Sequence, residues 1–221
     1  MLNRITLYSS FTGDESLVLN QDALWLGCLF LEGLPNSNQS TYKHISINAR
    51  ENWGDIEGDT FKSYDGISYY ANFNLELYRN KASHKEKSLH LLDYLHSKLI
   101  TYETGIPRSA LDDDYQYCID RNFQFCKRSK RKNASLKGRR GRSCYLYGEI
   151  NIEEFRLYVI IEDSKLMTAQ RFLVATPPRY FFDNFNGYKL KVNLDNTIDI
   201  WDASYYKDNL RLEGLQLDFE G

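Results

Sequence analysis

Apolar and polar residues alternate along several short segments of the chain, which is the pattern of β-strands with one buried face. Residues 3–8 and 42–48 show this alternation, and the longest example covers residues 68–78. In that segment the alternation turns one set of side chains inward, namely Tyr69, Ala71, Phe73, Leu75 and Leu77. Because strands with one polar face are typical of antiparallel sheets, we predict a strand of that type over residues 68–78.

The second half of the chain predicts two hairpins and a last strand. Residues 144–150 and 155–162 flank a short polar segment, as the two arms of a hairpin do. Residues 188–194 and 197–201 predict the second hairpin, and residues 210–219 predict the last strand.

Two helices are predicted between these groups of strands. The first begins at Ser83, because Ser83 and Glu86 form a capping box and leucines then recur at helical spacing as far as Leu99. The second begins near Leu111 and has an apolar stripe that continues to Cys126. Three carboxylates follow Leu111, and the positive end of a helix dipole accounts for them without a metal ion: Asp112, Asp113 and Asp114.

These elements together predict one α+β domain over residues 1–221. We expect a mainly antiparallel sheet with two or more helices packed on one side. A division into subdomains over residues 1–105 and 106–221 is the alternative.

The composition is that of an ordinary globular protein, with 42% hydrophobic and 26% charged residues in 221. Its 17 Tyr and 12 Phe favour strands and, to a lesser degree, recognition surfaces. The formal net charge of −2 argues against a general binder of nucleic acids or membranes, unless positive charge is segregated in one part of the chain.

The most apolar segment near the N-terminus, residues 23–34, is too short to span a bilayer and is not placed like a signal peptide. We therefore expect a cytoplasmic protein whose four cysteines are reduced thiols. No CxxC pair is present, so a zinc site is not expected, and the sequence predicts no cofactor.

The strongest local anomaly in charge is the basic segment, residues 127–142, which has nine Lys and Arg among sixteen residues and no acidic residue. Such a segment can contact RNA phosphates or an acidic protein surface, or it can be a solvated, mobile connector. No aromatic residue interrupts the basic residues, which weakens the case for stacking on nucleic-acid bases. The candidate partner-binding residues in the segment are Arg131, Lys132, Arg139, Arg140 and Arg142.

The opposite charge is concentrated in the acidic loop, residues 51–59, around Trp53. Tryptophan is frequent at the centre of interfaces and carboxylates can imitate a phosphate backbone, so Trp53, Asp55, Glu57 and Asp59 are candidate partner-binding residues. Their spacing does not match a calcium loop. An ordinary surface loop is the alternative.

A search for catalytic motifs finds no P-loop, GxSxG, HExxH or dinucleotide fingerprint. Asp163 and Lys165 have the spacing of the D-x-K element of metal-dependent nucleases, with Glu149 as an upstream carboxylate. That element normally lies in a strand with an apolar middle residue, whereas EDSK has the composition of a turn. We therefore predict that the protein is not an enzyme.

The segment LHLLDYLHSK at residues 89–98, together with a basic segment that leads into two strands over residues 126–162, resembles the immunity proteins that bacteria make against polymorphic or contact-dependent toxins. The resemblance implies a cytoplasmic, non-enzymatic protein that binds and blocks a toxin domain, often a nuclease. The resemblance identifies no catalytic residue in this chain, and the interfaces of this family vary between its members.

The resulting functional prediction is a binding protein whose partner is a toxin domain. Two alternatives stay open. One is an RNA-binding protein or metal-dependent nuclease that uses residues 127–142, and the other is an inhibitor of a defence enzyme. No membrane partner is predicted.

Overall fold

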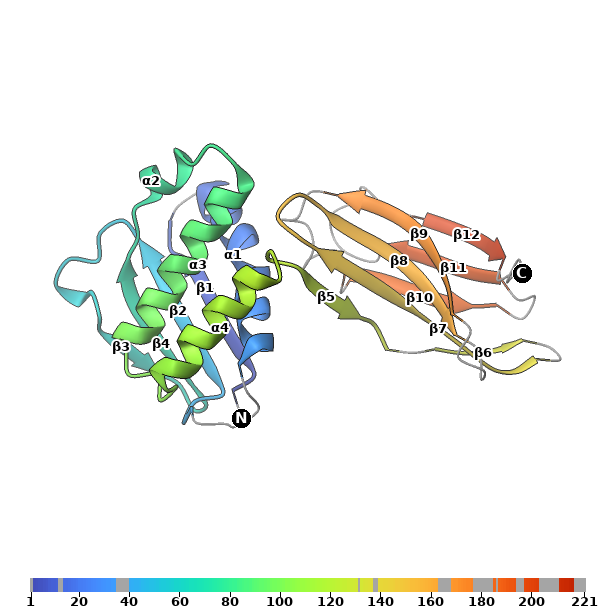
Figure 1. Ribbon diagram of the computed structural model, residues 1–221, viewed down its shortest axis with the longest axis horizontal. Helices are drawn as coiled ribbons and strands as arrows, with labels where there is room; N and C mark the ends of the chain where they lie inside the picture. Colours follow the sequence, from blue (N-terminus) through green and yellow to red (C-terminus); the bar gives the residue numbers. More distant parts are fainter. Residues whose placement is uncertain are drawn as a thin grey trace. The chain divides into compact units, whose positions relative to one another are not determined.

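The computed structural model divides the chain into two compact units (Figure 1). Unit 1 comprises residues 1–125 with 151–153, and unit 2 comprises residues 126–150 with 154–221. The predicted α+β class with mainly antiparallel pairing is confirmed. The structure describes residues 2–11, 14–34, 40–130, 132–136, 139–162, 168–176, 185, 187–193, 197–202 and 211–216.

Unit 1 contains a four-stranded sheet in the order β1-β2-β4-β3. The strands β1 (Arg4–Ser9), β2 (His44–Arg50) and β4 (Gly66–Asn72) run parallel, and the short β3 (Thr60–Lys62) runs antiparallel along the outer edge of β4. The chain returns from β2 to β4 through the 3₁₀ turn η1 (Gly54–Ile56) and β3. No helix is used for this return, although parallel neighbours are usually joined by one.

The prediction of one antiparallel strand over residues 68–78 is confirmed only in part. The strand β4 pairs antiparallel with β3, but its other neighbour, β2, is parallel to it, and the strand ends at Asn72. Residues Leu75–Arg79 form the helix α2 instead, because the side chain of Asn74 accepts a hydrogen bond from the Leu77 amide at 2.8 Å and so caps a helix.

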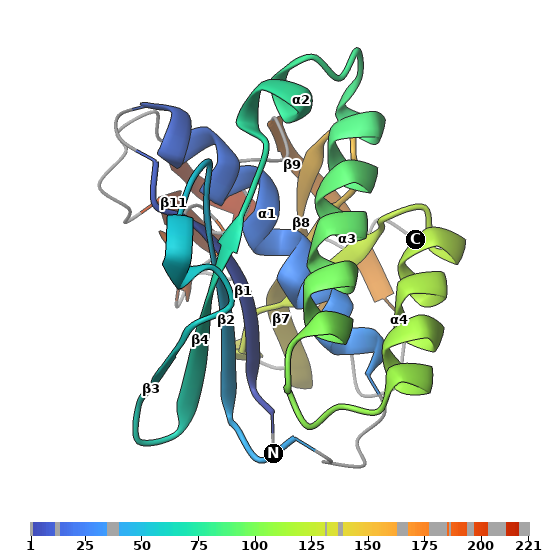
Figure 2. The ribbon, with the colours of Figure 1, turned by 90° about the vertical axis from the view of Figure 1, so that its left-hand side faces the viewer.

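Three helices cover one face of this sheet: α1 (Asp14–Gly33), α3 (His84–Thr101) and α4 (Arg108–Asp120) (Figure 2). The alternation pattern did not predict α1, which buries Leu19, Leu26 and Phe30. The alternative boundary at residue 105 would separate α4 from α1 and α3, which it contacts inside unit 1.

The helix α1 lies directly on β1 at Gly27. A Cβ atom at this position would lie 2.4 Å from the carbonyl oxygen of Ile5. Glycine is therefore required here by the close approach of two backbones rather than by its conformational freedom.

The predicted start of α3 is confirmed, because the Ser83 hydroxyl accepts a hydrogen bond from the Glu86 amide at 3.2 Å. The prediction for α4 needs correction. This helix begins at Arg108, one turn earlier than expected, so Asp114 lies beyond the first turn and is buried. It ends at Asp120 rather than Cys126, because Asn122 and Phe123 adopt positive φ angles of 49° and 60°.

Unit 2 is built from two sheets. The larger one has the order β5-β7-β8-β9, with β6 also paired to β7, and the smaller one has the order β10-β11-β12. Both predicted hairpins and the last strand are confirmed. The strands are β5 (Phe125–Arg128), β6 (Lys132–Leu136), β7 (Arg139–Ile150), β8 (Phe155–Glu162), β9 (Thr168–Thr176), β10 (Tyr188–Val192), β11 (Thr197–Asp202) and β12 (Arg211–Gln216).

One face of the larger sheet, the core face, buries apolar side chains from β7 and β8. These side chains include Leu146, Ile150, Phe155 and Leu157. Phe185 packs on this face, because a Cβ atom at Gly148 would lie 2.7 Å from its Cδ2 atom.

The four cysteines, all of them within the described residues, form no disulfide bond, as predicted. Within the described residues, no helix combines the length and apolar character needed to cross a membrane.

Candidate functional site

The sheet of unit 1 has two chemically different faces. Ile5, Ile47 and Tyr69 point toward the helices and are at most 2% exposed. The residues between them are mostly polar and form the open face, which we define as the side of the sheet away from α1, α3 and α4 (Figure 2). Parallel strands normally have both faces covered, so an open polar face on such strands is unusual.

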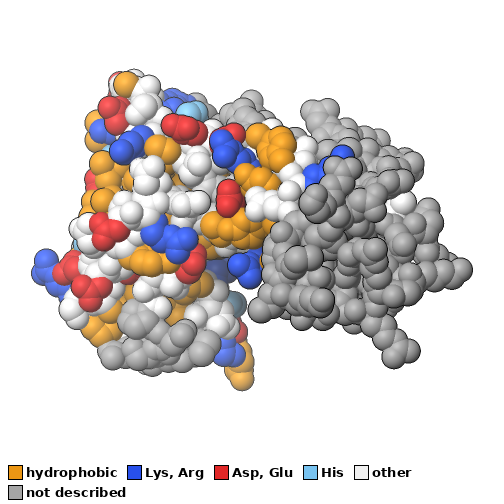
Figure 3. All heavy atoms as spheres, turned by 45° about the vertical axis from the view of Figure 1, so that its right-hand side comes forward, with side chains coloured by type: hydrophobic (Ala, Val, Ile, Leu, Met, Phe, Trp, Pro, Cys, Tyr) orange, Lys and Arg blue, Asp and Glu red, His pale blue; other side chains and the backbone are white. Residues whose placement is uncertain are grey.

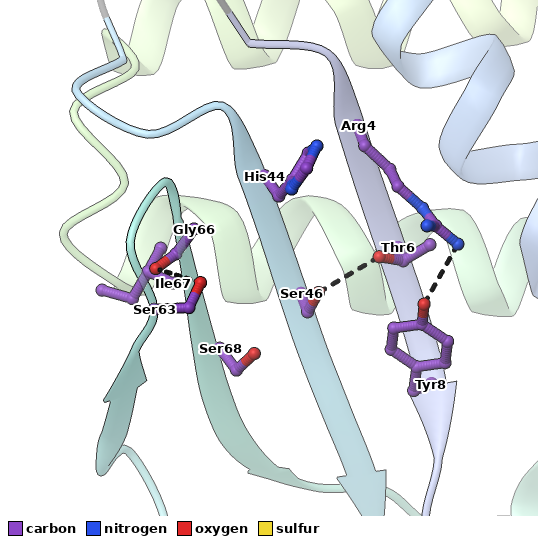
Figure 4. Close-up of a pocket in the computed structure, with 9 residues that line it drawn as sticks. All are labelled: Arg4, Thr6, Tyr8, His44, Ser46, Ser63, Gly66, Ile67 and Ser68. Carbon is purple, nitrogen blue, oxygen red and sulfur yellow. Dashed lines mark hydrogen bonds between the residues drawn. The ribbon is translucent and has the colours of Figure 1, made fainter.

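The parallel register arranges the open face in rows. Thr6, Ser46 and Ser68 occupy one row of hydroxyl groups, and Arg4 and His44 occupy the row before it. These rows form the floor of a groove of about 180 Å³ (Figure 4). Its polar lining residues are Arg4, Thr6, His44, Ser46, Ser63 and Ser68.

Hydrogen bonds hold one side of this groove in place. The Arg4 guanidinium donates from Nη2 to the Tyr8 hydroxyl at 3.0 Å and so spans Thr6, which is 2% exposed (Figure 4). The Oγ1 atom of Thr6 lies 3.2 Å from Oγ of Ser46. The groove therefore offers a fixed guanidinium and a row of hydroxyl groups to a polar partner.

A hydroxyl, an imidazole and a carboxylate also occur together at this end of the sheet, but they do not assemble a nucleophilic triad. Nδ1 of the His44 imidazole and Oδ1 of the Asp65 carboxylate are 3.7 Å apart, which is too long for a hydrogen bond. The Ser63 hydroxyl donates to the carbonyl oxygen of Gly66 at 3.3 Å rather than to the imidazole. This geometry supports binding better than nucleophilic chemistry.

The predicted acidic loop packs against the far end of the open face through Trp53. The indole Nε1–H donates to the Asn48 carbonyl at 3.0 Å, and the Trp53 amide donates to Oδ1 of Asn72 at 2.8 Å. The indole ring lies 4.6 Å from the ring of Tyr70, and the Arg50 guanidinium lies 5.3 Å from the indole. Trp53 thus attaches the loop to the sheet and is half-buried.

The carboxylates of the acidic loop have two different environments. Glu57 accepts hydrogen bonds from Lys98 Nζ at 3.1 Å and from the Asn72 amide at 3.3 Å. The hydrogen bond from Lys98 is the main cause that lowers the pKa of Glu57. Asp55 and Asp59 are exposed. Of the predicted residues, Glu57 therefore fixes the loop, whereas Asp55 and Asp59 face solvent.

Two exposed aromatic side chains flank the open face and were missed by the sequence prediction. Phe61 of β3 pairs with Ser68 and is 61% exposed. Tyr64, in the turn between β3 and β4, is 102% exposed. Phe61 and Tyr64 are three residues apart, a spacing that places two side chains on one face of a helix but not of a strand, so their common location here depends on the hairpin.

The predicted basic segment belongs to unit 2, and most of its described residues lie in strands. Its residues enter β5, β6 and the start of β7, and β6 and β7 form an antiparallel hairpin. Among the candidate residues, Arg131 lies outside the described residues. The backbones of Lys132, Arg139, Arg140 and Arg142 lie in this hairpin, and the positions of their side chains are not described.

Asp163 and Lys165, the two residues of the nuclease-like spacing, also lie outside the described residues. Within the described part of the chain, no group of three or more His, Cys, Asp or Glu side chains is placed to hold a metal ion.

Comparison of the chain with protein-family models, with curated proteins and with solved structures finds no match.

Proposed function

We propose that the chain is a non-enzymatic binding protein that docks a partner protein on the open face of unit 1. The observation that carries this proposal is a parallel sheet with helices on one face and ordered polar side chains on the other. A partner that covers the open face would supply the layer that parallel strands usually have.

The β3–β4 hairpin supports the choice of a protein as the partner. Phe61 and Tyr64 expose large aromatic surfaces beside the polar groove. Aromatic side chains surrounded by polar groups are the usual anchors of protein interfaces. On the side that Figure 3 shows, acidic, basic and hydrophobic side chains are interspersed over unit 1, and no large patch of one kind is present there.

The distribution of charge indicates what kind of protein fits. Unit 1 contains 11 Lys and Arg against 18 Asp and Glu, a formal charge of −7, whereas unit 2 contains 17 against 12, a formal charge of +5. An acidic unit attracts a basic partner and accelerates its association. A basic nuclease toxin is such a partner, and the resemblance of residues 89–98 and 126–162 to immunity proteins suggests this form of the function.

The test first asks whether a gene adjacent to the one for this chain encodes a toxin domain, and then uses that domain, purified as an inactive variant. We expect one-to-one binding in titration calorimetry, and protection of cells that express the active toxin. Because each interface anchor contributes on the order of 2 kcal/mol, Phe61→Ala combined with Tyr64→Ala should weaken binding by roughly a hundredfold or more.

The matched control is Leu77→Ala, since Leu77 is an apolar side chain of unit 1 that is 48% exposed but lies in α2. This variant should bind normally. Equal affinity of the double variant and the parent would remove the hairpin and the open face as the docking site. Failure of the toxin domain to bind at all would exclude the immunity function with that toxin.

A further inference from the structure

The groove on the open face of unit 1 contains a cation that no carboxylate neutralises. Figure 4 shows the Arg4 side chain extended along β1 toward Tyr8. Among the ion pairs of the described residues, none involves Arg4. Its guanidinium donates one hydrogen bond to the Tyr8 hydroxyl, and its other N–H groups donate to no described residue. Arg4 is therefore held in place and is still able to bind an anion.

The hydroxyl groups beside Arg4 supply uncharged donors. Thr6, Ser46 and Ser68 occupy equivalent positions of β1, β2 and β4. Thr6 and Ser46 share one hydrogen bond at 3.2 Å, whereas the half-buried Ser68 hydroxyl bonds to no described residue. Because each hydroxyl can donate a hydrogen bond, this row complements an oxygen acceptor such as a carboxylate.

No acidic side chain is among the described residues that line the groove. Asp65 precedes the lining residue Gly66, but its carboxylate oxygens lie 3.8 Å from Nζ of Lys43 and 3.7 Å from Nδ1 of His44. Lys43 offsets part of the charge of Asp65. The groove is therefore a local positive site on a unit whose formal charge is −7.

The size of the groove limits what can enter it. Its volume is about 180 Å³, whereas pockets that enclose a free small molecule usually measure about 300–1,000 Å³. The negative charge of unit 1 also repels a free anion with several charges, such as a phosphate. A single carboxylate carried on a protein surface satisfies both conditions.

The hydroxyl row ends at an aromatic side chain. Phe61 of β3 lies directly opposite Ser68, so its side chain is on the open face. Neighbouring strands are about 4.8 Å apart, so the three spacings from β1 to β3 put Phe61 roughly 14 Å from the strand of Arg4. A partner that uses both would present an apolar group and a carboxylate at about this separation.

We propose that the groove binds an aspartate or glutamate side chain of the partner protein, with the carboxylate on Arg4 and on the hydroxyls of Ser46 and Ser68. This inference rests on the proposed function, because it names the group of the docked protein that enters the open face. Guanidinium and carboxylate form strong, charge-assisted hydrogen bonds. A partner that is basic overall would be attracted by the charge of unit 1, and one acidic side chain in the groove would fix its orientation.

The experiment measures titration calorimetry of the full-length chain with the inactive toxin domain. Arg4→Met keeps the apolar stem but removes the guanidinium, so affinity should fall roughly thirtyfold or more. Arg4→Lys keeps the charge without the planar fork and should give an intermediate affinity. Ser46→Ala combined with Ser68→Ala should weaken binding by roughly tenfold.

The matched control is Arg108→Met. It also removes one positive charge from unit 1, but the Arg108 side chain is 76% exposed on α4, which covers the other face of the sheet. This variant should bind like the parent. Thermal melting monitored by circular dichroism checks that all variants are folded.

A double-mutant cycle identifies the carboxylate. Each Asp and Glu of the toxin domain is replaced in turn by Asn or Gln, and one of these changes should weaken binding to the parent but not to Arg4→Met. A purely structural role of Arg4 would not produce this coupling.

A titration without the partner tests the groove alone. Addition of sodium acetate should cause saturable changes in the NMR signals of Arg4 Nε–H and of the Ser46 and Ser68 amides, and Arg4→Met should abolish them. Tighter binding of inorganic phosphate than of acetate would assign the groove to phosphate groups and overturn the proposal.

The two possible failures are distinguishable. If the parent binds the toxin domain and folded Arg4→Met binds equally well, or if no acidic residue of the partner couples to Arg4, the groove is not the carboxylate site and docking on the open face stands. If the parent does not bind the toxin domain, docking of that toxin is excluded, and the acetate titration decides about the groove. Absence of acetate-dependent changes at Arg4 would overturn the proposal.

Discussion

The carboxyl group of Asp114 in α4 packs against Gly33 at the end of α1, so closely that a Cβ atom on Gly33 would lie 1.8 Å from Oδ1 of Asp114. Asp114 is 1% exposed, and neither of its carboxyl oxygens has a hydrogen-bond partner in the described part of the chain. Burial raises the pKa of this carboxyl from 3.8 to about 8. The Asp114 carboxyl group, which lies in the contact between α1 and α4, is therefore protonated and uncharged below about pH 8.

Asp114 should make the stability of the protein depend on pH. The unfolded chain releases this proton near pH 3.8, whereas the folded chain holds it up to about pH 8. The contribution of Asp114 to the free energy of unfolding is therefore fully present below pH 3.8. It decreases as the pH rises from 3.8 to about 8, by up to about 1.4 kcal/mol per pH unit. We expect Asp114→Asn to flatten this dependence and to raise the melting temperature at pH 8 and above.

Denaturant unfolding of the parent and of Asp114→Asn at several pH values checks this prediction. Asp113→Asn is the matched control, because Asp113 is the exposed neighbour of Asp114 on the same helix. Parallel stability curves for the parent and Asp114→Asn between pH 4 and pH 8 would show that the buried carboxyl does not determine the pH dependence.

Gly27→Ala should destabilise unit 1, although alanine is the better helix former. In an open helix position this change stabilises by up to about 1 kcal/mol. Here the added methyl would lie 2.4 Å from the carbonyl oxygen of Ile5, so α1 or β1 has to move. We expect a net loss of roughly 1–3 kcal/mol in the free energy of unfolding. An increase in stability on urea denaturation would show that α1 does not lie on β1 as described.

The acidic loop should accelerate association with a basic partner through the exposed carboxylates of Asp55 and Asp59 rather than through Glu57. Replacing Asp55 and Asp59 by Lys should slow association with a basic partner and weaken its salt dependence, because exposed charges act mainly on the association rate. Stopped-flow or surface plasmon resonance at two salt concentrations measures both quantities. An unchanged association rate would place the interface away from this loop.

Glu57→Gln should affect the structure of the acidic loop more than the rate of association. It removes a charge that Lys98 and Asn72 already hold, so the loop should loosen and its amide protons should exchange faster. The association rate should change less than in the variant of Asp55 and Asp59. Glu51→Gln, an exposed residue at the start of the same loop, is the control for the loss of one charge.

The strands were predictable wherever alternation alone determines the faces. Alternation correctly identifies β1 and β2 and the buried side of β4, because Tyr69 and Ala71 are both inaccessible. It does not reveal the direction of the neighbouring strand. The polar residues of the open face make parallel strands resemble antiparallel ones in sequence, which is why the parallel pairing of β4 with β2 was not predicted.

The helix α1 and the cross-strand ring pairs of Tyr158 were missed for different reasons. The buried residues Leu19, Ala23, Leu26 and Phe30 of α1 recur at helical spacing, but apolar residues such as Leu24 and Leu31 also occupy the rest of the helix, so the polar face that marks an amphipathic helix is weak. The contacts of Tyr158 with Tyr147 and Phe172 depend on the register between three strands, and a shift of one residue would turn Tyr158 to the core face. By contrast, the capping box at Ser83 is local in sequence and predicted its helix start correctly.

The position of β4 between β2 and β3 also sets an order of events during folding. The β3–β4 pair is local, with Lys62 opposite Ile67, and such a hairpin closes in microseconds. The pairing of β4 with β2, and of β2 with β1, joins residues far apart in the sequence and closes larger loops. The hairpin that carries Phe61 and Tyr64 should therefore form first and be captured afterwards by the growing sheet.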